Sequence, residues 1–126
     1  MEEISAGGRL DLPLHIDRQF RPWRYEVSHR RLVFRGSVDE MGETIDVVFL
    51  DVLGMKIRHK YDQLLIADAD DRLEIDEFVD VPERHDARYV RLTVSDGVHV
   101  GFVVCASVHI VEGNQTLDGS SGPFSP

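Results

Sequence analysis

The chain has 126 residues, a formal net charge of −9 and 42% hydrophobic residues, which together indicate one soluble globular domain. Its single cysteine, Cys105, excludes an intramolecular disulfide and a metal site built from several cysteines. The acidic start (MEEISAGGRL) lacks the apolar core of a secretory signal, and no uncharged apolar run is long enough to span a membrane. We therefore expect a cytoplasmic protein without membrane contact, ordered over about residues 12–112 and loose at 1–9 and 113–126.

The first predicted element is a β-hairpin over residues 21–38. Apolar and aromatic residues alternate in its two arms, at Trp23, Tyr25 and Val27 and at Leu32, Phe34 and Val38. A loop at 28–31 gives a register in which Trp23 covers Gly36. The same register predicts that the aromatic side chains face the core and the arginines face the opposite side.

The middle of the chain predicts three further strands, at 44–52, 55–61 and 64–67. The first is apolar on both faces, as in a central strand, whereas the second alternates and is expected to be half exposed. Gly54 marks a bulge or turn between them. The apolar positions of 73–79 fit a strand or one helical turn, and short helices are expected at 62–65 and 76–81.

A second hairpin is predicted over residues 87–113, where the apolar residues of both arms fall at even positions. A two-residue loop, Asp96–Gly97, would pair even positions with odd ones. A three-residue loop, Ser95–Gly97, pairs Val94 with Val98 and keeps one apolar face, with the glycine in the left-handed conformation. We therefore expect the three-residue loop.

The last strand of this hairpin is too long to run straight. An unbroken strand from Val98 to Val111 would extend about 46 Å, so we expect a bend at Gly101 or at Ala106–Ser107. Taken together, these elements predict a mainly β fold. It would be a small antiparallel sandwich or barrel of about six to eight strands with at most one or two short helices.

Charge is segregated along the chain. Residues 68–86 contain nine acidic residues and two arginines, whereas residues 15–35 contain six arginines and two acidic residues. The two segments could orient a charged partner or a second copy of the chain, or they could lie against each other. A partner-binding surface is predicted in the acidic segment, at Asp68, Asp70, Asp71, Glu74, Asp76 and Glu77.

Three other kinds of site fit the sequence less well. A calcium loop starting at Asp68 would place Arg72 at a ligand position and Leu73 where glycine belongs. The arginines and aromatics of the first hairpin suit nucleic acid, but the net charge of −9 disfavours phosphate contacts. The six histidines lack metal-ligand spacing, although distant histidines could still converge on zinc or iron.

A second candidate site lies on one face of the last strand, where small residues could line a groove. The predicted ligand pocket consists of His99, Gly101, Cys105, Ser107 and His109. A tight contact with another helix or sheet is the competing explanation. Cys105 and His109 would lie about 13 Å apart along a strand, too far for a nucleophile–base pair.

These observations favour a non-catalytic binding or protein-interaction module of unknown partner that uses the acidic segment 68–86. Its partner would be a protein or a second copy of the chain, engaged through charged loops or a free strand edge. The alternative is a small-molecule-binding domain or enzyme with its pocket on the face around Gly101. We expect no catalytic residue set, no metal site and no cofactor, and no contact with nucleic acid.

Overall fold

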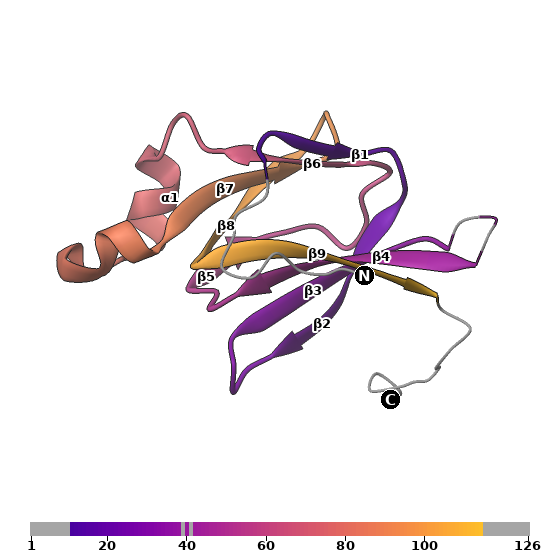
Figure 1. Cartoon of the computed structure of the whole chain (residues 1–126). Helices are drawn as coiled ribbons and strands as arrows, with labels where there is room; N and C mark the ends of the chain where they lie inside the picture. Colours follow the sequence, from indigo (N-terminus) through magenta and orange to yellow (C-terminus); the bar gives the residue numbers. More distant parts are fainter. Residues whose placement is uncertain (1–10, 39, 41, 115–126) are drawn as a thin grey trace.

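The computed structural model describes residues 11–38, 40 and 42–114 and shows a mainly β protein made of two antiparallel sheets (Figure 1). Sheet A has the strand order β1-β6-β7-β8-β5: Leu14–Ile16, Leu64–Asp68, Val90–Ser95, Val100–Cys105 and Gly54–Lys56. Sheet B has the order β2-β3-β4-β9: Phe20–Glu26, Arg31–Gly36, Glu43–Leu50 and Ser107–Asn114. The predicted mainly β class is confirmed, and the two sheets do not close into a barrel.

The core lies between the two sheets. Phe34 and Phe49 of sheet B pack edge to face with ring centroids 5.4 Å apart, and Phe34 stacks on Tyr61 at 5.6 Å. Sheet A contributes small and branched residues to the same core, such as Leu92 and Val103. Each sheet thus contributes side chains from one of its faces to the core, as the period-two pattern predicts for sheets packed face to face.

The first predicted hairpin forms as β2 and β3, but its register differs from the expected one. The turn occupies residues 27–30, and the pairing shifts between Pro22 and Arg24. Phe20, not Trp23, lies opposite Gly36 and touches the position that a Cβ would take there. A bulge re-aims the side chain at the shift. The expectation that Trp23 lies in the core is therefore wrong.

The central strand is confirmed, because β4 lies between β3 and β9. The strand predicted at 55–61 is shorter than expected: β5 ends at Lys56. Tyr61 belongs to no strand and makes one isolated bridge to Phe20. Its buried hydroxyl accepts a hydrogen bond from the backbone N–H of Arg58 at 2.9 Å, which closes the intervening loop.

Two short helices lie between β6 and β7: the α-helix α1 (Leu73–Phe78) and the 3-10 helix η1 (Glu83–Arg88). The helix expected at 62–65 is wrong, because Leu64 begins β6 with its side chain in the core. The helix expected at 76–81 lies a few residues earlier. It ends at Phe78 because Val79 takes an extended conformation.

The second hairpin forms as β7 and β8, but neither of the predicted registers occurs. Val94 lies opposite Gly101 instead of Val98, and the last pair joins Ser95 to Val100. The loop therefore has four residues. Even positions pair with odd ones, and the apolar residues from Phe102 to Cys105 stay covered because this part of β8 is buried on both sides.

The side chain of Asp96 stabilises this longer loop. One carboxylate oxygen accepts the backbone N–H groups of Val98 at 2.9 Å and His99 at 2.7 Å, and the hydroxyl of Ser95 accepts the N–H of Gly97 at 2.8 Å. Gly97 has a φ of 97°, so the expected left-handed glycine is confirmed. Hydrogen bonds from His99 and Val98 lower the pKa of Asp96 to about 2.

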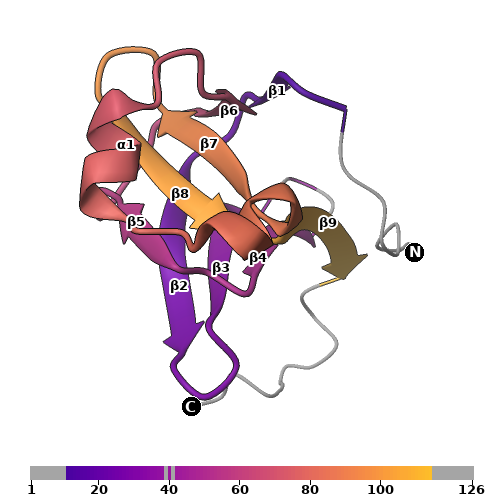
Figure 2. The same cartoon turned by 90° about the vertical axis from the view of Figure 1, so that its left-hand side faces the viewer.

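The chain crosses from sheet A to sheet B at Ala106, where the predicted bend is confirmed. β8 ends at Cys105 and β9 begins at Ser107 (Figure 2). In β8 the odd-numbered side chains face the core, whereas in β9 the even-numbered Val108 does. Strand β9 continues to Asn114, beyond the expected start of the loose tail, and the rest of the expected loose ends lies outside the described residues.

The loop predicts a specific pH dependence. The pKa of Asp96 falls on folding from its ordinary value of 3.8 to about 2, so its charge stabilises the fold above that ordinary value. The contribution is lost as the pH falls toward 2. We expect Asp96→Asn to lower the free energy of unfolding at neutral pH, and the difference from wild type to shrink in acid. Urea titrations between about pH 3 and pH 7 measure it; a difference independent of pH would contradict the assigned loop.

Candidate interaction surface

The acidic segment forms an excursion from sheet A. It leaves the sheet at the end of β6, forms α1 and η1, and returns as β7. Figure 1 shows both helices at one end of the molecule. Ile75 and Val79 bury their side chains against Phe102 and Val104 of β8, which attaches the segment to the outer face of sheet A.

A buried arginine makes the second attachment. The side chain of Arg91 on β7 is only 7% exposed, and it contacts Asp76 of α1 at 3.3 Å and Asp86 of η1 at 2.8 Å. Arg72 approaches the same two carboxylates at 3.4 and 3.7 Å. Two acidic residues of the segment therefore have a structural role, because an unpaired charge at the position of Arg91 would be strongly unfavourable.

The other predicted surface residues have different environments. Asp71 accepts the backbone N–H of Leu73 at 3.0 Å at the start of α1, and Glu74 pairs with Lys56 at 3.0 Å. The remaining acidic residues are exposed and form no ion pair or side-chain hydrogen bond with the described part of the chain: Asp68, Asp70, Glu77, Asp80 and Glu83. These carboxylates are available to a partner.

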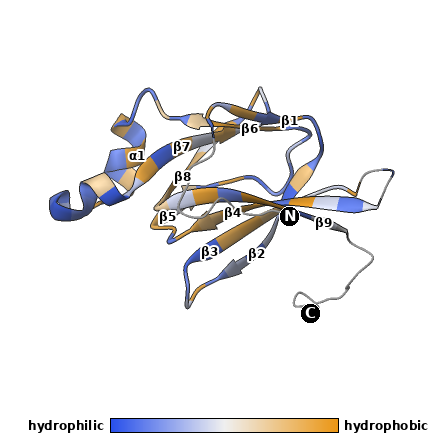
Figure 3. Cartoon of the chain, in the orientation of Figure 1, coloured by the Kyte–Doolittle hydropathy of each residue, from blue (hydrophilic) through white to orange (hydrophobic). Residues whose placement is uncertain are grey.

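Two large apolar side chains stand among these charges. Leu73 is 71% exposed and Phe78 is 66% exposed, although Phe78 contacts Phe102 edge to face at 5.6 Å. Residues four apart are neighbours on a helix, so Leu73 lies beside Glu77 and Phe78 lies beside Glu74. Figure 3 shows hydrophilic and hydrophobic positions mixed along α1. We call the exposed residues of 68–80 the acidic helix surface.

A shallow hollow of about 300 Å³ adjoins this surface, between the start of the excursion and η1. Asp68, Arg72, Asp86 and Arg91 line it together with Tyr89. Asp86 and the arginines neutralise one another, whereas Asp68 is exposed at the end of β6. The hollow therefore offers one available carboxylate to a cationic group.

The predicted pocket residues are not brought together. His99 lies in the β7–β8 loop, and Gly101 packs so closely on β5 that a Cβ would overlap the carbonyl oxygen of Lys56. Cys105 lies in the core, while Ser107 and His109 lie in sheet B. The expected common face is wrong because the chain changes sheets at Ala106. At Gly101 the competing explanation, a tight contact within a sheet, is the one that the structure shows.

Two of these residues contact each other. The hydroxyl of Ser107 lies 2.9 Å from Nε2 of His109, and His109 is buried. Its Nδ1 finds no hydrogen-bond partner within the described ranges, so no carboxylate orients the ring as a general base requires. Burial raises the pKa of the Cys105 thiol to about 12, which keeps it protonated and unreactive at neutral pH.

Four of the six arginines in residues 15–35 have carboxylate partners of their own within the described chain. Arg24 and Arg31 pair with Glu26, Arg35 pairs with Asp46, and Arg30 pairs with Asp51. These pairs show that carboxylates outside 68–86 neutralise much of the basic hairpin.

Asp51 is the centre of a group of polar contacts that the sequence did not indicate. Arg30 and Asp51 both have a positive φ, and Asp51 accepts hydrogen bonds from Arg30 and from the Tyr89 hydroxyl at 2.8 Å. Arg88 lies 3.6 Å away. Burial alone would raise the pKa of Asp51, but these hydrogen bonds outweigh it and lower the pKa. This group joins the β2–β3 turn to the end of η1, and it depends on contacts distant in sequence.

Known proteins give no further guide to this surface. No family model matches the chain, and no curated protein or solved structure is significantly similar to it. Within residues 11–38, 40 and 42–114, no three His, Cys, Asp or Glu side chains are placed to hold a metal ion. Neither helix of the described chain is long and apolar enough to cross a membrane.

The close contact at Gly101 predicts a large effect of a small substitution. Gly101→Ala forces β5 away from β8 and should lower the free energy of unfolding by about 1–3 kcal/mol or more, as overpacking does. Gly113→Ala is the matched control, because a Cβ there meets no atom within 4 Å. Chemical denaturation of both variants measures the effect. Equal stabilities would show that β5 does not pack on Gly101.

Proposed function

We propose that the protein is a non-catalytic interaction module that binds a basic segment of a protein partner on its acidic helix surface. The observation that carries the proposal is the combination of available carboxylates with exposed Leu73 and Phe78 on a helix that is fixed from below. Because these apolar side chains stand among the carboxylates, one partner segment can make apolar and charged contacts at the same time.

The chemistry of the surface defines the partner. Arginine or lysine side chains would meet the carboxylates of Asp70 and Glu77, and apolar side chains would cover Leu73 and Phe78. Aromatic residues in the centre of an interface commonly supply most of its affinity, while surrounding charges set orientation and association rate. A segment that alternates basic and apolar residues satisfies both requirements.

The attachment of α1 favours binding without a large rearrangement. Ile75 and Val79 anchor one side of the helix, and Arg91 holds it through Asp76. A surface that is already ordered loses little conformational entropy when a partner binds. The excess negative charge of the chain would add attraction that weakens with salt.

The alternative of a small-molecule pocket around Gly101 has no geometric support, since its five residues do not converge on one site. The expectation of a cytoplasmic protein stays a prediction. So does self-association. Strand β9 is the edge of sheet B and, among the described strands, pairs only with β4, which leaves one side for another strand.

A defined peptide tests the proposed surface. We expect a synthetic peptide of alternating arginine and leucine to bind the wild-type protein, with an affinity that falls as salt is added. Peptides of arginine and serine, or of glutamate and leucine, should bind more weakly. Reversing three charges should weaken binding about tenfold and flatten its salt dependence, as measured by fluorescence anisotropy. The variant carries Asp70→Lys, Glu74→Lys and Glu77→Lys.

A second variant with the same change in net charge is the control. It carries Asp17→Lys, Asp62→Lys and Glu112→Lys, three exposed residues outside the acidic segment. This control should bind almost as wild type does. An equal loss of peptide affinity in both variants would show that only net charge matters. Unchanged affinity in the first variant would refute the proposed surface. Sedimentation of the free protein distinguishes self-association from peptide binding.

A further inference from the structure

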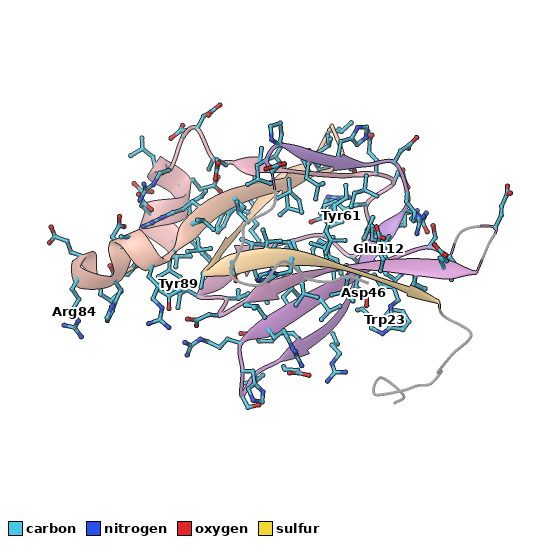
Figure 4. The ribbon with its side chains drawn as sticks, viewed as in Figure 1. Trp23, Asp46, Tyr61, Arg84, Tyr89 and Glu112 are labelled. Atoms are coloured by element: carbon cyan, nitrogen blue, oxygen red, sulfur yellow. The ribbon has the colours of Figure 1, made fainter. Side chains whose placement is uncertain are left out.

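The outer face of sheet B has a hollow of about 280 Å³ that the acidic helix surface does not involve. Trp23, Arg21, Arg35 and Val38 are among the residues that line it, together with Gly36. Figure 4 shows Trp23 and Asp46 near one another and Arg84 at the opposite end of the molecule. The hollow thus combines an aromatic ring with cationic groups.

The bulge in β2 places the tryptophan in this hollow. The pairing with β3 shifts between Pro22 and Arg24, so Trp23 is the extra residue and turns away from the core. Its side chain lies under the guanidinium of Arg35, whose central carbon is 4.9 Å from the ring centroid. The residue is still 44% exposed, which is unusual for the one tryptophan of a small domain.

Only one of the two arginines in the hollow is paired with a carboxylate of the described residues. Arg21 and Arg35 lie directly opposite each other on neighbouring strands, an arrangement that is unfavourable for like charges. Arg35 donates two hydrogen bonds of 2.9 Å to Asp46. Arg21 is exposed and makes no ion pair with the described residues. An anion bound at Arg21 would relieve the repulsion.

We propose that this hollow binds a small anion with a planar ring, of the nucleoside monophosphate class, with its base against Trp23 and its phosphate on Arg21. Arginine recognises phosphate through paired N–H donors, and tryptophan stacks on planar rings. The volume suits a single small ligand. A nucleic acid strand fits less well, because the net charge of −9 opposes repeated phosphate contacts.

The single tryptophan makes the test direct, because all tryptophan fluorescence comes from the proposed site. We expect AMP to change the emission of Trp23 saturably, with excitation beyond the absorption of adenine. Adenosine and inorganic phosphate each offer half of the ligand. Both should bind at least about tenfold more weakly than AMP. A single-stranded oligonucleotide should bind no better than AMP.

Two arginine variants complete the test. Arg21→Gln removes an exposed charge without touching the core and should weaken AMP binding about tenfold. Arg84→Gln makes the same change at the far end of the molecule and should leave AMP binding unaltered. Calorimetry of Trp23→Leu should show a loss of AMP binding with the fold retained. The proposal is wrong if AMP does not bind, if Arg21→Gln binds AMP as wild type does, or if phosphate alone or the oligonucleotide binds more tightly.

Discussion

The ion pairs of Arg91 constrain the part of the chain that carries the proposed interaction surface. Arg91 is the second residue of β7 and lies on the face of sheet A that the acidic excursion covers. Its side chain is almost fully buried, so carboxylates must reach it. Asp76 and Asp86 do so from two different helices, and the chain between β6 and β7 has to fold back over the sheet. The remaining acidic residues of the excursion are left facing solvent.

The crossing from sheet A to sheet B at Ala106 separates the residues that the sequence had placed in one pocket. Because one residue inverts the alternation, Cys105 faces the core while His109 lies on the outer face of sheet B. The predicted pocket disappears with this inversion. The two proposed sites lie apart, an acidic and apolar surface beside sheet A and a basic and aromatic hollow on sheet B.

Most of the strands and the bend at Ala106 could be predicted because alternation, turn residues and strand length are local signals. Of the two short helices, α1 begins a few residues before the predicted one, and η1 was not predicted. The registers could not be predicted. A carboxylate that binds two backbone N–H groups lengthened the loop at Asp96, and a bulge re-aimed Trp23. The acidic segment is evident in the sequence, but the roles of Asp76 and Asp86 depend on Arg91. The sequence around Arg91 does not indicate which distant acidic residues its side chain will contact.

The most direct test of the acidic helix surface is whether α1 is an ordered part of the free protein. Hydrogen–deuterium exchange can compare the backbone N–H groups of 75–79 in wild type and in Arg91→Met. We predict protection of these groups in wild type, and faster exchange in the variant while the strands of sheet B keep their protection. Exchange in wild type at the rate of an unstructured peptide would contradict the account, because the acidic residues would then form a mobile loop.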